Sequence, residues 1–260
     1  MESNKDVVIT RHPAKYVVEL RINRPKARNA LNRPVRESLA DNFKAISEDP
    51  SIRCVILTGG DRVFAAGADL RDIADATPIE MYSRHVEKLW EAISACPKPI
   101  IAAVNGFALG GGCELAMHAD VIIAGNNAQF GQPEIKVGIM PGAGGTQRLA
   151  RAVGKFHAMK MLLTGLPISG TEAVSMGLAS EVVDDDHVLD RALELAKLIA
   201  DMPPIAAEQI KEVLLAGSDI PLNSALALER KAFQLLFDTN DQSEGMQAFF
   251  EKRKPVYSGE

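Results

Sequence analysis

The chain has 260 residues, of which 47% are hydrophobic and 24% are charged, a composition typical of a folded globular protein. Its formal net charge of -5 argues against a protein that mainly binds nucleic acid, because such binding depends on Lys and Arg side chains that neutralise phosphates. No apolar run approaches the length of a membrane span, and the N-terminal stretch MESNKDVVITRH lacks the apolar core of a signal peptide. We therefore expect a soluble, cytoplasmic protein with neither a nucleic-acid nor a membrane partner.

The three cysteines, Cys54, Cys96 and Cys113, are odd in number and far apart in the sequence. This pattern favours neither a disulfide framework nor a paired CxxC metal site. We expect all three to be reduced core residues, and we predict no bound metal.

The first part of the chain predicts a hairpin, a helix and a buried strand. Apolar residues alternate with charged ones over residues 16–22, and a turn separates them from a short strand at residues 7–10. Asn32 is a suitable N-cap for a helix with Pro34 in its first turn, and apolar residues then recur at helical spacing. The run 54–57 ends in Thr-Gly-Gly and predicts a buried strand that leads into a loop.

The middle of the chain continues this alternation. A helix is predicted over residues 78–95, ended by Pro97 and Pro99, with Tyr82 and Trp90 on its apolar side. A buried strand follows at residues 99–104, then a short helix at 113–117 and a strand at 121–124. Strands separated by helices indicate an α/β layer arrangement, without showing which strands are neighbours.

From about residue 185 the chain becomes predominantly helical. The predicted helices cover residues 188–200, 204–215, 221–237 and 242–252. We divide the chain into a strand-bearing core, residues 1–200, and a helical C-terminal segment, residues 201–260. The sequence leaves open whether that segment packs on its own core or on a neighbouring subunit.

A glycine-rich turn stands between the strand at residues 99–104 and the short helix. Gly106 and Gly110–Gly112 do not match the G-x-G-x-x-G spacing of a dinucleotide-binding loop, and no acidic strand end follows at a suitable distance. Without Cβ atoms, these residues let a ligand approach the N–H groups at a helix N-terminus, which is what an oxyanion requires. Close packing of the helix on the sheet is the alternative explanation.

Two glutamates stand beside glycine-rich loops. Glu114 lies in the first turn of the short helix, among small and apolar residues, where a surface carboxylate stabilised by the helix dipole is the simpler interpretation. A carboxylate near apolar surface is also suited to acid or base chemistry. Glu134 lies twenty positions further on, just before a second glycine-rich turn at residues 141–145. The two carboxylates suggest paired acid–base work on one substrate, although the sequence does not show that they meet.

Five motifs together closely resemble the crotonase superfamily and, within it, the enoyl-CoA hydratases. They are FAAGAD (64–69), AAVNG (102–106), ALGGGCE (108–114), FGQPE (130–134) and PGAGGTQR (141–148). The likeness covers nearly the whole chain, including the ending FFEKRKP (249–255). It implies an α/β fold with a core spiral of ββα turns, and a helical C-terminal segment that helps to build homotrimers or hexamers made of two trimers.

The same resemblance implies roles for individual residues. The N–H groups of Ala68 and Gly111 would form an oxyanion hole for a thioester carbonyl. The coenzyme A portion of the substrate would lie against Lys26, Ala27, Ala66, Asp69 and Leu70. The basic turn 24–28 carries three cationic side chains, which supplies the local positive charge that a coenzyme A phosphate requires, although a solvated basic turn is an equally ordinary explanation.

The resemblance and the chemistry together predict an enoyl-CoA hydratase, a hydro-lyase that adds water reversibly to trans-2-enoyl-CoA and yields 3-hydroxyacyl-CoA in fatty-acid or related acyl-CoA degradation. Glu114 would position water and remove its proton, and Glu134 would protonate C2. The acyl-CoA thioester is the expected partner, and no cofactor is expected beyond the coenzyme A of the substrate. His85 and His118 are expected to be a helix-surface residue and a packed polar residue, not catalysts.

Two alternatives remain. The nearer one is another crotonase-family reaction, such as enoyl-CoA isomerisation, dehalogenation, or hydration of an aromatic-pathway or branched intermediate. Glutamate at both 114 and 134 favours a hydratase, because isomerases of the family commonly keep just one of this pair. The more distant one is a non-catalytic crotonase-fold binding protein, for example one that binds RNA, which a long basic run would support; the sequence contains only the short cluster 252–254.

Overall fold

A computed structural model describes residues 7–260 and shows an α/β fold with two sheets. The larger sheet has six strands in the order β1-β2-β3-β4-β6-β9, and the smaller has the order β5-β7-β8. Within the described residues, no helix has the length and apolar character needed to cross a bilayer. Residues 1–6, on which the expectation of no signal peptide partly rests, lie outside the described part.

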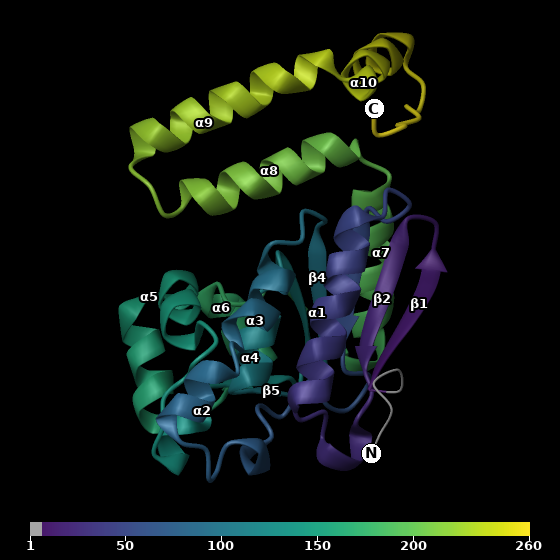
Figure 1. The fold of residues 1–260 in the computed structure, drawn as a ribbon. Coiled ribbons are helices and arrows are strands. Elements are labelled where there is room, and N and C mark those ends of the chain that lie inside the picture. Colours follow the sequence, from purple (N-terminus) through teal and green to yellow (C-terminus); the bar gives the residue numbers. More distant parts are fainter. Residues whose placement is uncertain (1–6) are drawn as a thin grey trace.

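The predicted hairpin, helix and buried strand at the start of the chain are confirmed. Strands β1 (Val8–Ala14) and β2 (Val17–Ile22) pair antiparallel, and β3 (Cys54–Thr58) then joins β2 in parallel. Helix α1 (Arg33–Glu48) begins at the predicted cap, because the Asn32 side chain accepts a hydrogen bond from the Val35 N–H at 3.2 Å. Its apolar side covers one face of the large sheet (Figure 1).

The middle of the chain winds as a spiral of ββα turns. Strand β4 (Ile100–Val104) belongs to the large sheet, β5 (Phe107–Leu109) to the small one, and α4 (Gly111–Ala116) follows. The next turn repeats this order with β6 (Val121–Gly125) and β7 (Gln129–Gly131), which pair in parallel with β4 and β5. Each turn therefore advances both sheets by one strand.

The second turn leads through the 3-10 helix η3 (Pro133–Val137) into a long helix. Helix α5 (Gly145–Thr164) contains a kink at Gly154. Residues 145–183, after the second glycine-rich turn, had no predicted elements. The structure places four there: α5, β8 (Ile168–Ser169), α6 (Gly170–Met176) and β9 (Glu181–Val183).

Helices cover both faces of the large sheet. One face packs against α1 and α3 (Glu87–Ser94) through residues such as Leu20, Leu57 and Ala102. The other packs against α7 (Val188–Ala200), whose alanines Ala192 and Ala196 contact a second apolar cluster that includes Ile56. When both faces of a parallel sheet are covered, its strands consist of consecutive apolar residues instead of alternating apolar and polar ones. This explains why every residue of β3 and β4 is buried. The three cysteines are free and buried, as predicted.

The prediction of one helix over residues 78–95 was wrong. The structure has two helices, α2 (Pro78–Ser83) and α3 (Glu87–Ser94), separated at His85. His85 has φ of +45°, a left-handed conformation that a continuous right-handed helix does not admit. Tyr82 consequently does not share a buried side with Trp90 but is 75% exposed.

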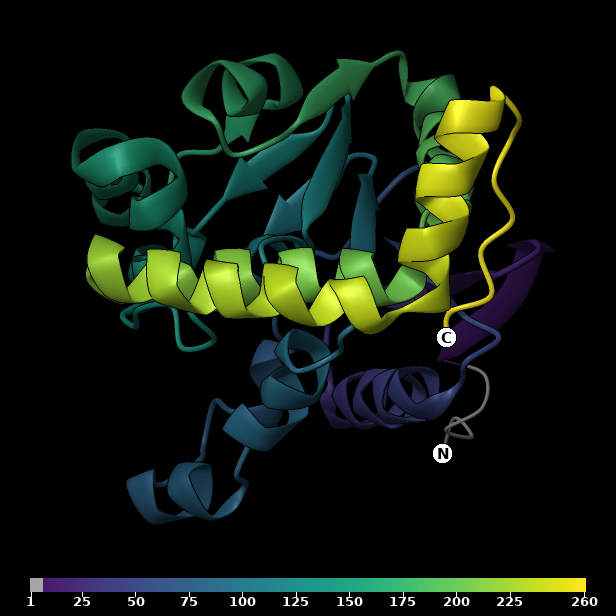
Figure 2. The ribbon, with the colours of Figure 1, turned by 90° about the horizontal axis from the view of Figure 1, so that it is seen from above.

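The predicted C-terminal helices are present. They are α7, α8 (Pro204–Gly217), α9 (Leu222–Leu235) and α10 (Asn240–Glu251). Helices α8 and α9 lie side by side across one end of the sheet (Figure 1), and α10 turns away from α9 at a steep angle (Figure 2). Helix α7 packs on the large sheet, whereas α8 packs mainly on α9. The change from helices that cover the sheet to helices that pack on each other therefore falls close to residue 200. The division into two domains stays a prediction.

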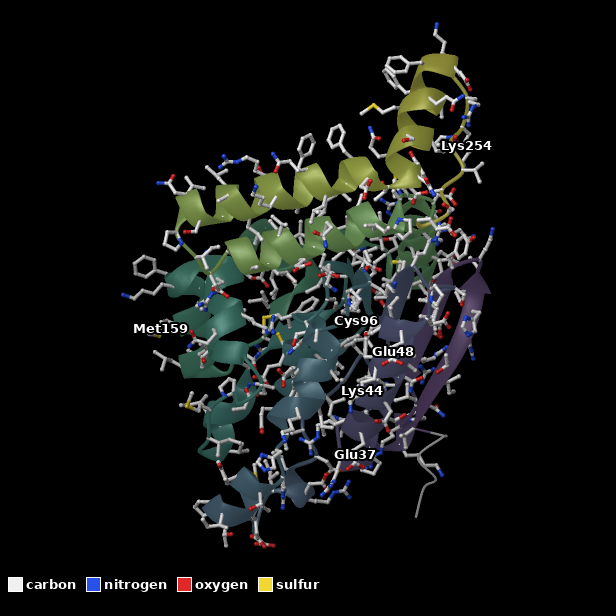
Figure 3. The ribbon with its side chains drawn as sticks, turned by 45° about the horizontal axis from the view of Figure 1, so that its top comes forward. Glu37, Lys44, Glu48, Cys96, Met159 and Lys254 are labelled. Carbon is white, nitrogen blue, oxygen red and sulfur yellow. The ribbon has the colours of Figure 1, made fainter. Side chains whose placement is uncertain are left out.

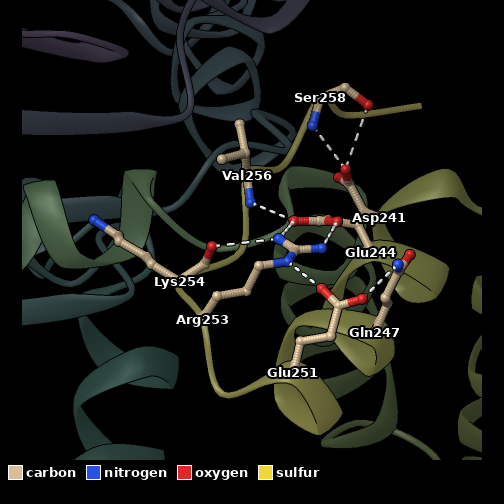
Figure 4. Close-up of polar contacts among 8 residues, drawn as sticks. All are labelled: Asp241, Glu244, Gln247, Glu251, Arg253, Lys254, Val256 and Ser258. Atoms are coloured by element: carbon tan, nitrogen blue, oxygen red, sulfur yellow. Dashed lines mark hydrogen bonds and ion pairs between the residues drawn. The ribbon is translucent and has the colours of Figure 1, made fainter.

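The end of the chain folds back onto α10 (Figure 4). Arg253 donates to both carboxylate oxygens of Glu244 at 2.6 and 2.7 Å, and Glu244 also accepts from the Val256 N–H. The buried carboxylate of Asp241 accepts from the N–H groups of Ser258 and Gly259. These contacts hold the last residues of the chain against the final helix.

Candidate functional site

The register of the small sheet brings the two predicted oxyanion-hole residues together. Ala65 pairs in parallel with Ala108, and three positions beyond these partners lie Ala68 and Gly111. A Cβ built on Gly111 would lie 3.5 Å from the Ala68 backbone nitrogen. The Gly111 N–H also belongs to the first turn of α4, where helix N–H groups have no intrahelical partner. Two adjacent turns of the spiral therefore bring the Ala68 backbone nitrogen close to Gly111.

Gly110 makes the sharp turn from β5 into α4. Its φ is +50° and its ψ is -124°, a conformation in which side chains are strongly disfavoured. The Gly110 N–H donates to the Gly131 carbonyl at 2.8 Å, which fixes the turn to the next strand. A Cβ at Gly110 would lie 2.7 Å from Glu134 Oε1. Glycine is thus required here both by the backbone and by the carboxylate beside it.

Glu114 is a buried carboxylate held by backbone donors. Its Oε1 accepts hydrogen bonds from the N–H groups of Ala143 and Gly145, each at 2.7 Å. Both donors belong to the second glycine-rich turn, at the N-terminal end of α5. Burial raises the pKa of Glu114, and the two N–H donors and the positive charge of Arg148 oppose that rise. The two N–H donors and Arg148 therefore limit the rise in pKa that burial causes for this carboxylate.

Glu134 lies in η3, half-buried, on the other side of Gly110. Burial, with a smaller contribution from the negative charge of Glu114, raises the pKa of Glu134 to about 7. With its amide nitrogen facing the carboxylate, the fully buried Gln132 donates to Glu134 at 3.1 and 3.2 Å. Unlike Glu114, Glu134 accepts no pair of backbone amides from a neighbouring loop, so its protonated form is populated near neutral pH.

Asn29 holds the loop that carries Ala68. Its buried amide nitrogen donates to the carbonyls of Gly59 and Val63 at 2.8 Å each, and its oxygen accepts from the Arg24 N–H. Asn29 has φ of +55°, which asparagine tolerates better than most residues. The side chain therefore joins the basic turn to the segment that leads into the oxyanion site.

The residues expected to contact coenzyme A gather at this same junction. Lys26 and Ala27 lie in the 3-10 helix η1 (Pro25–Ala27), and the N–H of Ala66 donates to the Arg28 carbonyl at 3.1 Å. Lys26, Arg28 and Leu70 are exposed, whereas Asp69 is buried. Asp69 forms ion pairs with Arg71 at 3.0 Å and Arg24 at 3.6 Å, and hydrogen bonds from Arg71 are the main reason that its pKa is lowered. Asp69 thus organises the basic turn instead of presenting a free carboxylate.

The two histidines lie in different surroundings. His85 is an exposed residue in the break between α2 and α3 and contacts Glu87 at 3.0 Å, so the expectation of a helix-surface position was wrong in detail. His118 is buried, stacks on Trp90 and donates from Nδ1 to the Glu114 carbonyl at 2.8 Å. Burial lowers the pKa of His118 to about 4, so its ring is neutral at physiological pH.

The assembled site has two backbone N–H groups close together, one carboxylate whose rise in pKa is limited by backbone donors, and one carboxylate whose pKa is raised to about 7. Such a site can stabilise negative charge on a carbonyl oxygen and move protons to and from neighbouring atoms. Within residues 7–260, no group of three His, Cys, Asp or Glu side chains is arranged to hold a metal ion.

Comparison with known proteins shows the family to which this chain belongs. The family model described as enoyl-CoA hydratase/isomerase matches residues 13–260. This chain belongs to the enoyl-CoA hydratase/isomerase family. The α/β crotonase fold expected from the motifs is therefore confirmed, and the two-sheet spiral is its form in this member of the family.

Relatives within the family share most of the length of the chain. The chain is 46% identical to 2,3-dehydroadipyl-CoA hydratase of Escherichia coli (strain K12) over 243 residues, which cover 94% of this chain and 95% of the relative. It is 46% identical to the mitochondrial enoyl-CoA hydratase of Pongo abelii over 235 residues, covering 90% and 81%. The crystal structure of enoyl-CoA hydratase from Bacillus anthracis superposes with a TM-score of 0.93 at 39% identity, covering 98% of this chain and all of the other.

Three contributors to the site received no role in the sequence analysis of this family member. Gln132 and Arg148 lie inside quoted motifs, and Asn29 lies just after the basic turn. Their polarity in apolar or glycine-rich stretches was the available signal. It does not reveal their partners. Asn29 and Arg148 act on residues that are distant in the sequence, and the spacing of Gln132 and Glu134, two positions apart, does not show that their side chains face each other.

Proposed function

We propose that this protein catalyses the reversible addition of water to trans-2-enoyl-CoA thioesters, giving 3-hydroxyacyl-CoA. The observation that carries the proposal is the placement of two carboxylates in different surroundings, the buried Glu114 and the half-buried Glu134, beside the glycine turn that carries Gly110 and Gly111. The names of several relatives support the same reaction class.

The backbone donors would activate the thioester. When the N–H groups of Ala68 and Gly111 bind the carbonyl oxygen, they stabilise the negative charge that moves onto it as a nucleophile attacks C3. The glycine backbone at positions 110–112 permits this close approach because it carries no Cβ atoms. The resulting enolate-like state is the point of highest charge, so fixed donors act where they lower the barrier most.

The carboxylates would then divide the proton transfers. Glu114, held ionised by two backbone N–H groups, orients water and accepts its proton while the water oxygen bonds to C3. Glu134, protonated near neutral pH, gives its proton to C2 as the enolate collapses. Glu114 has then gained one proton and Glu134 has lost one. Dehydration follows the same steps in the reverse order. Because the two groups interact, they titrate as a coupled pair.

The coenzyme A portion would occupy the junction of η1 and the loop at residues 66–70. Lys26 and Arg28 are exposed cations there, suited to the phosphates of the substrate, while Ala27, Ala66 and Leu70 offer small or apolar contacts. Asp69 contributes by fixing Arg24 and Arg71. No cofactor beyond the coenzyme A of the substrate is part of this mechanism, since proton transfer and charge stabilisation suffice for it.

A panel of trans-2-enoyl-CoA substrates tests the proposal, with loss of the conjugated thioester absorbance as the readout. The panel includes crotonyl-CoA, longer chains and 2,3-dehydroadipyl-CoA, for which one relative is named. No turnover of any substrate, combined with salt-sensitive retention on RNA, would favour the non-catalytic alternative. Isomerisation without hydration would instead indicate the neighbouring reaction of the family.

Two substitutions test the paired carboxylates. Glu114→Gln and Glu134→Gln are each expected to lower kcat by about 10² to 10⁴ without unfolding, because each removes a proton-transfer group. Glu48→Gln is the matched control, since Glu48 lies exposed near the end of α1 beside Lys44 (Figure 3). Near wild-type rates in either folded active-site variant would contradict the mechanism.

We also propose that the protein assembles as a homotrimer or as a hexamer of two trimers, in the cytoplasm. Helices α8 and α9 expose large apolar side chains that a monomer would leave in water: Ile210, Leu214, Leu222, Phe233 and Leu235. Three free, buried cysteines suit a reducing compartment. Light scattering after size-exclusion chromatography tests the assembly, and a monomeric mass would contradict it.

A further inference from the structure

Arg148 is a half-buried cation whose position no step of the proposed reaction explains. It lies in the first turn of α5, and its side chain doubles back toward the start of that helix, so that a Cβ on Gly144 would lie 3.1 Å from Arg148 Nε. Gly144 stands between Ala143 and Gly145, the two residues whose N–H groups hold Glu114. The guanidinium therefore lies directly behind the glycine turn that binds the carboxylate.

Two carboxylates attract the guanidinium without contacting it: Asp219 and, with a smaller effect on its pKa, Glu114. Within the described residues, no hydrogen bond or salt bridge engages the Arg148 side chain, whereas Arg151, one turn further along α5, pairs with Asp219 at 3.3 Å. Arg148 instead borders a cavity of about 500 Å³ that reaches from His118 to α8 and is lined mainly by apolar residues. A cation beside such a cavity is screened less than one at the surface.

We propose that Arg148 is a positioning residue that keeps the active-site proton on Glu134 by holding Glu114 ionised. The inference rests on the proposed function for its kinetic consequence, but the charge distribution that it describes exists in the protein without substrate.

The other titratable groups around the site do not supply this charge. They are Cys113 from α4, His118 beyond it, Glu134 from η3, Arg151 from α5 and Asp219 from the α8–α9 connection. Asp120 and Lys211 line the same cavity as Arg148 and pair with each other at 2.8 Å. The pKa of Cys113 is raised to about 12 by burial and that of His118 is lowered to about 4, so both are neutral at physiological pH. Arg151 and Asp219 are exposed and paired with each other. Arg148 remains as the cation that acts on Glu114.

Removal of the Arg148 charge is expected to raise the pKa of Glu114. Without the positive charge, the Glu114 carboxylate is less stable, its pKa rises toward that of Glu134, and the single proton is shared between the two groups. Because the proposed reaction needs Glu114 ionised, activity would then be lost at a higher pH as the solution is acidified. We expect the acidic limb of kcat/KM to move upward by about one pH unit.

The experiment compares Arg148→Met with Arg148→Lys and with the control Arg151→Met. Methionine keeps the packing of the apolar stem while removing the charge, and lysine keeps the charge. We expect the acidic limb of kcat/KM to lie at higher pH in Arg148→Met than in the wild type. In Arg148→Lys it should lie close to the wild-type position, and in Arg151→Met it should be unchanged. An equal loss of rate at every pH, with the limb unmoved, would indicate a merely structural role and overturn the proposal.

A titration without substrate separates this inference from the proposed function. Carbon-13 NMR of protein labelled at the glutamate carboxyl carbons, with the Glu114 signal assigned through Glu114→Gln, reports the pKa directly. We expect that pKa to rise in folded Arg148→Met and not in Arg151→Met. An unchanged Glu114 titration refutes the role of Arg148, whatever reaction the protein catalyses; an upward shift in a protein that hydrates no enoyl-CoA would refute only the proposed function.

Discussion

Replacing Gly110 by alanine perturbs the position of Glu134 without altering either carboxylate chemically. The added Cβ would lie 2.7 Å from Glu134 Oε1, roughly 0.7 Å inside the 3.4 Å at which ordinary contact begins. Gly110 itself is fixed, because its N–H is bonded to the next strand and the following residue starts α4. The Glu134 side chain must therefore move by most of an ångström.

Gly110→Ala has two separate effects, one on the stability of the fold and one on the rate of the reaction. The alanine side chain in the conformation of Gly110 destabilises the fold by about 1 to 3 kcal/mol. A misplacement of about 1 Å at a catalytic group lowers the rate by roughly 10²-fold, because a proton can be delivered only within hydrogen-bond reach. We therefore expect Gly110→Ala to stay folded and to lose about 10² in kcat on crotonyl-CoA, with KM changed by less than about threefold, since the coenzyme A contacts are elsewhere.

Gly154→Ala is the matched control. Gly154 also has a positive φ, +75°, but a Cβ there would meet no atom within 4 Å. This variant should show a comparable drop in melting temperature and retain kcat within about threefold. If Gly110→Ala keeps the wild-type kcat while melting like Gly154→Ala, then Glu134 does not act from the position seen in the structure, and the argument for it as the proton donor is refuted.

Four further measurements test other parts of the structure. The rate of hydration should fall as the pH rises above about 7, because Glu134 then loses the proton that it donates; a profile that stays level to pH 9 would contradict this. Asn29→Ala should lower the free energy of unfolding by about 2 kcal/mol in urea titrations, since two partly buried carbonyls lose their donor; an unchanged midpoint would contradict it. Glu244 has its pKa lowered to about 2 by hydrogen bonds from Arg253, so the C-terminal contacts should persist above the ordinary pKa of 4.5 and be lost as the pH falls toward 2. Hydrogen exchange at Val256 measures this, and Arg253→Met should move the loss to higher pH. Dialysis against EDTA should leave the hydration rate unchanged, whereas a loss restored by a divalent cation would show that a metal takes part.

The elements that the sequence predicted well are those specified by local chemistry. The hairpin at the start and α1 follow from strict alternation and from Asn32 placed before Pro34, and both signals act within a few residues. Helices α8 and α9 are similarly marked by prolines near their starts. The break at His85 was missed because nothing in the residues around it forbids a helix; the left-handed conformation belongs to the folded chain.

The candidate site was predictable in its parts and not in its assembly. Residue by residue, glycines at 110–112 indicate backbone donors, and Glu114 and Glu134 suggest paired acid–base groups without showing that they meet. Ala68 came only from the family resemblance. In the structure, the partners meet because Ala65, Ala108 and Phe130 are in register across the small sheet. Register between strands that are distant in the sequence depends on tertiary packing, so no single segment encodes it.

The class of protein, most of its helices and the chemical groups available for a reaction could be predicted from the amino-acid sequence. The ionisation preferences of those groups follow from the folded arrangement. Glu114 and Glu134 are the same amino acid, yet the buried Glu114 is held by two backbone N–H groups and lies near Arg148, while the half-buried Glu134 has a negative neighbour and a pKa raised to about 7. The ionisation of a carboxylate depends on its solvation and on nearby charges, and both are properties of three-dimensional position.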